Sequence, residues 1–234
     1  CFYLQIVPFI SILKQKNTDF KLISQLIFML KNLLFLILLL PFYTSAQSNW
    51  QQFKKLQGAQ KTWVLLHPFK AKKAFIVSRE ASRVSDSLRA SPLLDGDHAG
   101  GQVDAFRHAF WMALLRQQIG ENAARSLGKA HEKDNYKTYK ERKLEDGVIP
   151  DQISSEMDLF NNEVGLTLSK KGGNLPKNGL IYRVINAIHQ GKLKIIKKDK
   201  NGNFLTCNNE VISKKTLIGK WKNNKCLVSS NYNR

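Results

Sequence analysis

The stretch Gln102–Ile119, QVDAFRHAFWMALLRQQI, decides the fold of this chain. Two glycines precede it and Gly120 follows it, which predicts one long helix with defined ends. On a helical wheel its main apolar stripe is made of Val103, Phe106, Phe110, Ala113 and Leu114. A second line with helical spacing contains Asp104, His108, Trp111 and Leu115. A solvated face rarely combines Trp and Leu with an Asp–His pair. We therefore expect this helix to be covered on two sides, with Asp104 in reach of His108.

Four further helices are expected around this one, over residues 68–90, 121–134, 152–171 and 178–190, and Asp151 is the predicted N-cap of helix 152–171. In helix 68–90 the predicted apolar contacts are Phe69, Phe75, Ile76, Val84 and Leu88. The polar stretch 135–150 is interpreted as a loop or a frayed helix. Alternation over 192–198, a turn at residues 199–202 and a second apolar stretch at 204–207 predict a β-hairpin, and residues 208–228 leave room for further short strands. The expected fold is mainly α, a helical bundle core with a small C-terminal β-hairpin region (α+β).

Two of these helices carry polar residues beside their apolar stripes. In helix 121–134, His131 falls on the apolar side and Glu132 on its flank. In helix 152–171, the apolar stripe is Met157, Phe160, Val164 and Leu168, and a neighbouring line contains Asp158, Asn162 and Gly165, with Asn161 between the two. A glycine inside a helix costs about 1 kcal/mol relative to alanine. Gly165 therefore indicates that another backbone or a ligand approaches closely.

Packing the three apolar stripes together brings the polar lines near one another and predicts a site. A carboxylate beside an imidazole fixes its tautomer and raises its basicity, which suits a metal ligand or a general base. We expect one divalent metal ion to be held by His108, His131 and Asp158. The predicted catalytic residues are His108, Asp104, Glu132 and Arg107, and the accompanying polar cluster is Asn161, Asn162, Glu163 and Trp111; Asp97 and His98 lie in the loop just before. The alternative is a structural network of a satisfied core histidine, an Asp–His hydrogen bond and buried amides.

Three strings in these helices carry a family resemblance. They are D-A-F-R-H-A-F-W at Asp104–Trp111, A-H-E at Ala130–Glu132 and M-D-L-F-N-N-E-V-G at Met157–Gly165. They resemble an uncharacterised bacterial family that is catalogued only as a domain of unknown function. Similar strings occur in exported proteins and at the ends of large toxin-like proteins, which is compatible with a hydrolase. The order His108, His131-Glu132, Asp158 is also similar to the metal-dependent phosphohydrolases with the signature His, His-Asp, Asp, although Glu132 replaces the Asp.

The N-terminal residues are expected to lie outside the fold. Residues 1–28 are interpreted as a non-native upstream extension, because Met29 is the first methionine. Lys31, the apolar run Leu33–Leu40 and the small residues ending at Ala46 are typical of a signal peptide at residues 29–46. We therefore expect export to the periplasm or the medium, with an uncleaved membrane anchor as the alternative. The remaining domains are then a helical domain at 47–190, which carries the motifs, and a basic β-hairpin tail at 191–234.

Charge and cysteines bound the possible partners. The chain carries 37 Lys and Arg residues against 18 acidic ones, a formal charge of +19, and its excess lies in the flanks, because residues 93–168 hold 9 basic and 13 acidic residues. An acidic middle suits a cation site better than a phosphate-backbone groove. The expected partner is an acidic envelope surface or a phosphate-bearing substrate, with nucleic acid only as substrate. The sequence does not indicate an oligomeric state.

The two cysteines after the N-terminal region leave two alternatives. Cys207 and Cys226 permit one disulfide that would contribute roughly 3 kcal/mol, and two free buried thiols fit equally.

The function that these features favour is hydrolysis by an exported, metal-dependent enzyme acting on phosphoester or phospholipid bonds. The alternative is a non-enzymatic envelope or interaction protein whose His, Asp and Asn residues form a structural network. Neither a G-x-S-x-G elbow, a Walker-type loop, an H-E-x-x-H motif nor a Rossmann fingerprint occurs in the chain.

Overall fold

The computed structural model describes residues 25, 27–34, 51, 53–144 and 149–232. It contains two compact units, Cys1–Leu56 and Gln57–Arg234. In the first unit residues 27–34 are helical and exposed, and the expected cleavage region after Pro41 lies outside the described residues, as does most of the upstream extension. Within the described ranges, no helix has both the length and the apolar character needed to cross a bilayer.

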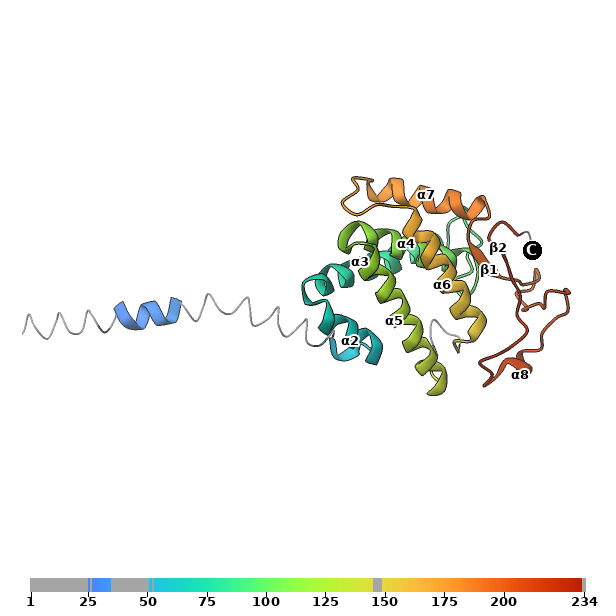
Figure 1. The fold of residues 1–234 in the computed structure, drawn as a ribbon, viewed down its shortest axis with the longest axis horizontal. Coiled ribbons are helices and arrows are strands. Elements are labelled where there is room, and N and C mark those ends of the chain that lie inside the picture. The colour runs from blue at the N-terminus through green and yellow to red at the C-terminus, as the bar shows by residue number, and fades with distance from the viewer. Residues whose placement is uncertain (1–24, 26, 35–50, 52, 145–148, 233–234) are drawn as a thin grey trace, which may run out of the picture. The chain divides into compact units, whose positions relative to one another are not determined.

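The second unit is mainly helical, as the sequence predicts (Figure 1). Its elements are α2 (Gly58–Leu66), α3 (Pro68–Leu88), α4 (Gln102–Ile119), α5 (Glu121–Lys140), α6 (Gln152–Thr167), α7 (Lys177–His189), β1 (Lys194–Ile196), α8 (Lys214–Leu217) and β2 (Leu227–Ser229). The two strands form one small antiparallel sheet near the C-terminus. These helices and strands confirm the predicted fold, a helical core with a small β region.

Helix α4 lies at the centre and is covered on two sides, which confirms the prediction from its wheel. On one side Phe106 and Phe110 pack with α3, α7 and β1, through residues that include Leu88, Leu180, Ile188 and Ile195. On the other side Met112 and Leu115 pack with α2 and α5, through Trp63, Ala123 and Leu127. Because both faces are buried, the polar side chains of α4 that lie on them, Asp104 and His108, must find partners within the protein.

Helix α5 continues to Lys140, beyond the predicted end near residue 134. The extra turns are held by polar contacts, since the Asp134 carboxylate accepts hydrogen bonds from the backbone N–H groups of Ala59 and Gln60, each at 2.9 Å. Asp134 thereby caps the N-terminus of α2 from another helix. The side chain of Gln57 also donates to Thr138 Oγ1, at 2.7 Å. The first part of the polar stretch 135–150, up to Lys140, is therefore helical because its side chains satisfy the end of α2, whereas residues 141–144 are not helical.

The buried faces of α3 and α6 differ from the predicted apolar stripes, because small or polar residues make many of the contacts. In α3, Phe69 is 96% exposed and Ile76 is exposed as well. The buried residues of α3 are Ala74, Val77, Ala81, Val84, Ser85 and Leu88. In α6, Phe160 is exposed, and the buried positions include the predicted polar line Asp158, Asn162 and Gly165. Both helices pack closely through small or polar side chains, which an apolar stripe does not reveal.

Helix α6 starts and crosses α4 as its sequence indicates. Asp151 caps it in a capping box, with Ser154 N–H donating to Asp151 Oδ1 at 2.9 Å and Asp151 N–H donating to Ser154 Oγ at 3.0 Å. Further along, a Cβ placed on Gly165 would overlap the carbonyl oxygen of Ala109 and lie 2.7 Å from its Cα. Only glycine permits this approach of the two backbones.

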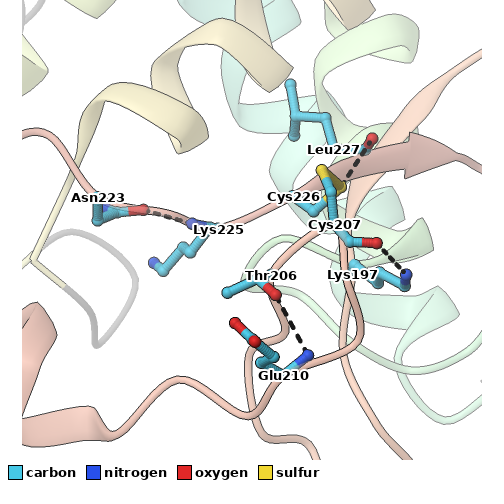
Figure 2. Close-up of a disulfide and its surroundings, with 8 residues drawn as sticks. All are labelled: Lys197, Thr206, Cys207, Glu210, Asn223, Lys225, Cys226 and Leu227. Atoms are coloured by element: carbon cyan, nitrogen blue, oxygen red, sulfur yellow. Dashed lines mark hydrogen bonds between the residues drawn. A yellow bond between two sulfur atoms is a disulfide. The ribbon is translucent and has the colours of Figure 1, made fainter.

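The sheet pairs strands that are farther apart than the predicted hairpin. Lys194, Ile195 and Ile196 of β1 pair with Ser229, Val228 and Leu227 of β2. The predicted partner, residues 204–207, meets the first strand through an isolated antiparallel bridge between Lys198 and Phe204 and a hydrogen bond from Leu205 N–H to Lys197 O, so the predicted hairpin is present in part, and Leu205 also forms a bridge with Val211. Cys207 and Cys226 form a disulfide beside the start of β2 (Figure 2), which confirms the first of the two alternatives for these cysteines. Cys226 N–H also donates to Leu205 O, so β2 and the 204–207 segment run together.

Gly165→Ala should destabilise the protein strongly, because the added methyl group meets the backbone of α4 rather than a flexible side chain. We expect a loss of about 3 kcal/mol or more in the free energy of unfolding, measured by urea denaturation. Gly58→Ala is the matched control, since a Cβ there meets nothing within 4 Å and the residue also lies in a helix. Equal stability of the two variants would contradict the close crossing of α4 and α6.

Candidate metal centre

Two neighbouring helices supply the polar residues at the centre of the site. α4 contributes Asp104 and His108, one helical turn apart, and α6 contributes Asp158 and Asn162, also one turn apart. All four side chains are buried, and His108 is 3% exposed. One ligand atom each of Asp104, His108 and Asp158 lies within 4.8 Å of the other two, so this group could hold a metal ion. The close crossing at Gly165 brings the two pairs together.

The imidazole of His108 is oriented by an amide. Its Nδ1 lies 3.3 Å from Asn162 Oδ1, and because an amide oxygen only accepts, Nδ1 carries the proton. In the neutral ring the lone pair is then on Nε2. Nε2 lies 3.3 Å from Asp158 Oδ1 and 3.7 Å from Asp104 Oδ1. A nitrogen lone pair and two carboxylate oxygens therefore face one another.

These separations match those of ligands around a small cation. Atoms that bind zinc tetrahedrally at about 2.1 Å are about 3.4 Å apart. The two distances from His108 Nε2, 3.3 and 3.7 Å, fall around that value. Asn162 provides the outer hydrogen bond that metal-binding histidines generally have.

Asp104 is held in place from two sides. Its Oδ2 accepts a hydrogen bond from the backbone N–H of Gly100, at 2.7 Å. Gly100 has a φ of +93°, a conformation that other residues rarely adopt. On the other side Arg107 Nη2 donates to Asp104 Oδ1 at 2.6 Å and lies 3.3 Å from His108 Nε2. The guanidinium thus supplies positive charge beside the two carboxylates.

The surroundings keep His108 neutral. Burial lowers the pKa of His108 well below its usual value of 6.5, and its electrostatic interactions with the neighbouring Arg107 and His131 lower it further. The hydrogen bond to Asn162 acts in the opposite direction and is the weaker effect. A neutral imidazole is the form that binds a metal ion, so this environment favours a ligand role for His108.

The burial of His131 and Glu132 is the reverse of the prediction, which put His131 on the apolar side of the helix and Glu132 on its flank. Glu132 is buried, and His131 is only partly buried at the edge of the site. The ring of His131 lies 6.0 Å from that of His108, and the group that could hold a metal ion contains Asp104 in place of His131. His131 Nδ1 accepts from the amide of Gln60, at 3.0 Å, so its proton is on Nε2. That atom lies 4.0 Å from Glu132 Oε1.

The remaining predicted residues separate into three roles. Asn161 exchanges two hydrogen bonds with the backbone of Lys194, each at 2.9 Å. It therefore holds β1 against α6 and takes no part in the site. Glu163 is exposed and pairs with Arg125. The indole of Trp111 lies edge-on to both His108 and His131 and donates to Ser78 Oγ. Of these residues only Trp111 lines the site.

A cavity of about 250 Å³ opens beside the two carboxylates. Its polar lining includes His98, Asp104, Arg107, Asp158, Lys214 and Lys220, and its apolar lining includes Leu144, Ile149, Ile196, Phe204, Leu217 and Ile218. Several of these residues come from the C-terminal segment, which sequence analysis assigns to a separate tail. No sequence motif marks these lining residues, and the lysine excess after residue 168 was the one feature that drew attention to this segment.

Two ion pairs hold the C-terminal segment over this cavity. Lys198 Nζ pairs with Asp97 at 2.6 Å, and Lys225 Nζ pairs with Asp151 at 2.5 Å. Both lysines are buried or nearly so, and both lie over the ring of Phe204. Asp97 and Asp151 come from the loop before α4 and the cap of α6, so the segment is fixed to the two helices that carry the site. Removing one member of such a buried pair is strongly destabilising.

The neutral state of buried His108 predicts a pH-dependent stability. Because the folded-state pKa lies below 6.5, the unfolded chain takes up a proton first as the pH falls, and the stability present above pH 6.5 decreases. This one group contributes at most about 1.4 kcal/mol per pH unit. We expect His108→Gln to flatten the dependence of the unfolding free energy between pH 7.5 and 5, measured by urea denaturation with EDTA present. His189→Gln replaces an exposed histidine and should keep the parent slope; equal slopes in all three proteins would contradict a buried neutral His108.

Comparison with known proteins gives a family but no activity. No curated protein and no solved structure matches the chain at a meaningful level. A family model described as a domain of unknown function (DUF6973) matches residues 61–192. This range contains α3 to α7 and therefore Asp104, His108 and Asp158, and it ends before the disulfide-bonded segment. The chain therefore belongs to the DUF6973 family, which confirms the expected membership of a family known only as a domain of unknown function.

Proposed function

We propose that this protein is a metal-dependent hydrolase that cleaves phosphoester bonds, including those of phospholipids, after export from the cell. The observation that carries the proposal is the buried group in which His108 Nε2 faces Asp104 and Asp158. In their ionised forms two carboxylates and one guanidinium leave this group with a negative charge. A divalent cation would balance that charge, and burial of such a group without one is costly.

A bound divalent cation would polarise a phosphoryl oxygen and lower the pKa of a water molecule. The chain's own residues would prepare that site. Asn162 orients the His108 ring, and Gly100 orients the Asp104 carboxylate. Imidazole and carboxylate ligands together suit zinc and manganese. The cavity beside Asp104 and Asp158 supplies the open side that a catalytic cation needs for its substrate.

The lining of the cavity favours a substrate with a phosphate group. Arg107, Lys214 and Lys220 line it, and these side chains pair with phosphate oxygens. The basic excess of the flanks would also attract an anionic substrate or an acidic envelope surface. Nucleic acid enters this proposal only as a substrate.

His131 and Glu132 are the candidates for proton transfer beside the cation site. Because Gln60 donates to Nδ1 of His131, the ring carries its proton on Nε2, the atom nearest to Glu132. His131 is partly exposed, so it can exchange protons with solvent. This pair supports a general acid next to the two carboxylates.

A second candidate function is a non-enzymatic envelope protein. One observation favours it: Arg107 Nη2 contacts both Asp104 Oδ1 and His108 Nε2, so the guanidinium occupies part of the position that a cation would take. In that case the buried group would be a structural network. His108→Ala would then lower the temperature of unfolding and leave binding to anionic surfaces unchanged.

Metal binding separates the two candidates. We expect the full chain to bind about one equivalent of Zn²⁺ or Mn²⁺ in calorimetric titration. His108→Gln and Asp158→Asn should each lower the affinity by a factor of about 100, as loss of a direct ligand or its outer support does. Hydrolysis of bis-p-nitrophenyl phosphate should be reduced in both variants. In the parent protein it should disappear with EDTA and return when metal is added.

His131→Gln is the matched control, because it removes a second imidazole near the site that lies outside the group of three. Its metal affinity should remain within a factor of about 10 of the parent. A folded parent protein that binds neither Zn²⁺, Mn²⁺ nor Mg²⁺ would reject the hydrolase and support the structural network. A loss of affinity in His131→Gln equal to that in Asp158→Asn would restore the ligand set expected from the sequence.

A further inference from the structure

The segment between the two disulfide-bonded cysteines forms a loop that is firmly held at its base. Cys207 and Cys226 close it (Figure 2), and Lys225, next to Cys226, pairs with Asp151. The Trp221 indole packs against the rings of Tyr136 and Tyr139, at 4.8 and 5.1 Å between centroids. Two hydrogen bonds, from Tyr139 Oη to Gly219 O and from Gln152 N–H to Trp221 O, connect it to α5 and α6. The loop is thus a fixed part of the surface.

The outer side of this loop combines exposed aliphatic and basic side chains. Ile218 of this loop is 72% exposed, and Leu144, which lines the same cavity, is exposed as well. Four exposed lysines surround Ile218 along the chain, namely Lys214, Lys215, Lys220 and Lys222. None of the four makes an ion pair with any residue that the structure describes, and residues 208–225 contain Glu210 as their one acidic residue.

This combination fits one kind of partner. Exposed aliphatic side chains gain free energy by entering an apolar phase, and lysines around them gain it from anionic head groups. A nucleic acid would attract the lysines but would bury neither Ile218 nor Leu144, and the one indole in the loop is already packed against tyrosines. An anionic bilayer satisfies both kinds of side chain.

We propose that the loop closed by Cys207 and Cys226 docks onto the surface of an anionic phospholipid bilayer, with Ile218 and Leu144 entering the head-group region. The docked loop would place the mouth of the cavity against the lipid phosphates, because Lys214, Leu217, Ile218 and Lys220 line that cavity. This consequence rests on the proposed hydrolase, and it restricts the substrates from phosphoesters in general to phospholipids. Docking itself needs no metal ion.

Hydrogen exchange of the full chain tests the docking and locates it, so that any separate lipid contact of the N-terminal residues does not interfere. We expect peptides covering residues 208–225 to exchange more slowly with vesicles of phosphatidylglycerol and phosphatidylcholine than with phosphatidylcholine alone. Each lysine near an anionic surface strengthens binding about fivefold. Lys214→Glu with Lys220→Glu should therefore weaken the vesicle affinity by more than about 25-fold. Ile218→Asp should weaken it about tenfold.

Matched controls separate this surface from general charge and hydrophobicity. Lys70→Glu with Lys72→Glu makes the same change in net charge on exposed residues of α3, and Leu65→Asp replaces a leucine that is 71% exposed on α2. Both controls should keep the parent affinity. Equal exchange of residues 208–225 with both kinds of vesicle, or slower exchange with single-stranded DNA only, would overturn the proposal.

The same experiment with EDTA, and with Asp158→Asn, distinguishes the two proposals. Protection of the loop should persist in both cases, because neither change touches the loop. Docking without metal binding would reject the hydrolase and keep the membrane surface. Metal binding and hydrolysis without protection of residues 208–225 would reject the membrane surface and keep the hydrolase.

Discussion

The contact between the backbones of α4 and α6 is the constraint on which the site depends. At Gly165 the two helices approach so closely that a methyl group would meet Ala109. At this separation short side chains can bridge the helices, and His108 reaches both Asp158 and Asn162. A larger residue at position 165 would move α6 outward and open these contacts. Glycine inside a helix lowers the stability of α6 taken alone. The contacts that its close approach to α4 allows offset that cost.

Burial gives this polar group its chemical character. In water Asp104, His108 and Asp158 would be ordinary titrating side chains. Enclosed between helices, the imidazole stays neutral with its lone pair directed at two carboxylates, while Arg107 provides positive charge at the rim. Such an arrangement either binds a cation or is a network balanced by the guanidinium. The geometry around His108 Nε2 favours the cation, because its distances to the carboxylate oxygens are those of neighbouring ligands.

The C-terminal segment adds a second layer to the family domain, whose match ends at residue 192. Lys198 and Lys225 anchor this segment to Asp97 and Asp151, and the disulfide fixes the loop between them. The helices thus supply the carboxylates and the imidazole, and the loop supplies the lysines and aliphatic side chains of the cavity wall. The acidic middle and the basic flank seen in the sequence meet at one cavity.

The sequence by itself determined what depends on neighbours along the chain. It predicted α4 from Gln102 to Ile119, the Asp151 cap, the adjacency of Asp104 and His108, and a close approach at Gly165, because these follow from helical periodicity and local hydrogen bonding. Tertiary structure decided the rest. Glu132 is buried and His131 only partly so, Asn161 holds β1, and β1 pairs with β2, because each of these depends on which distant segment packs alongside. A buried polar side chain has no apolar pattern, so only its partner in space shows that it belongs inside.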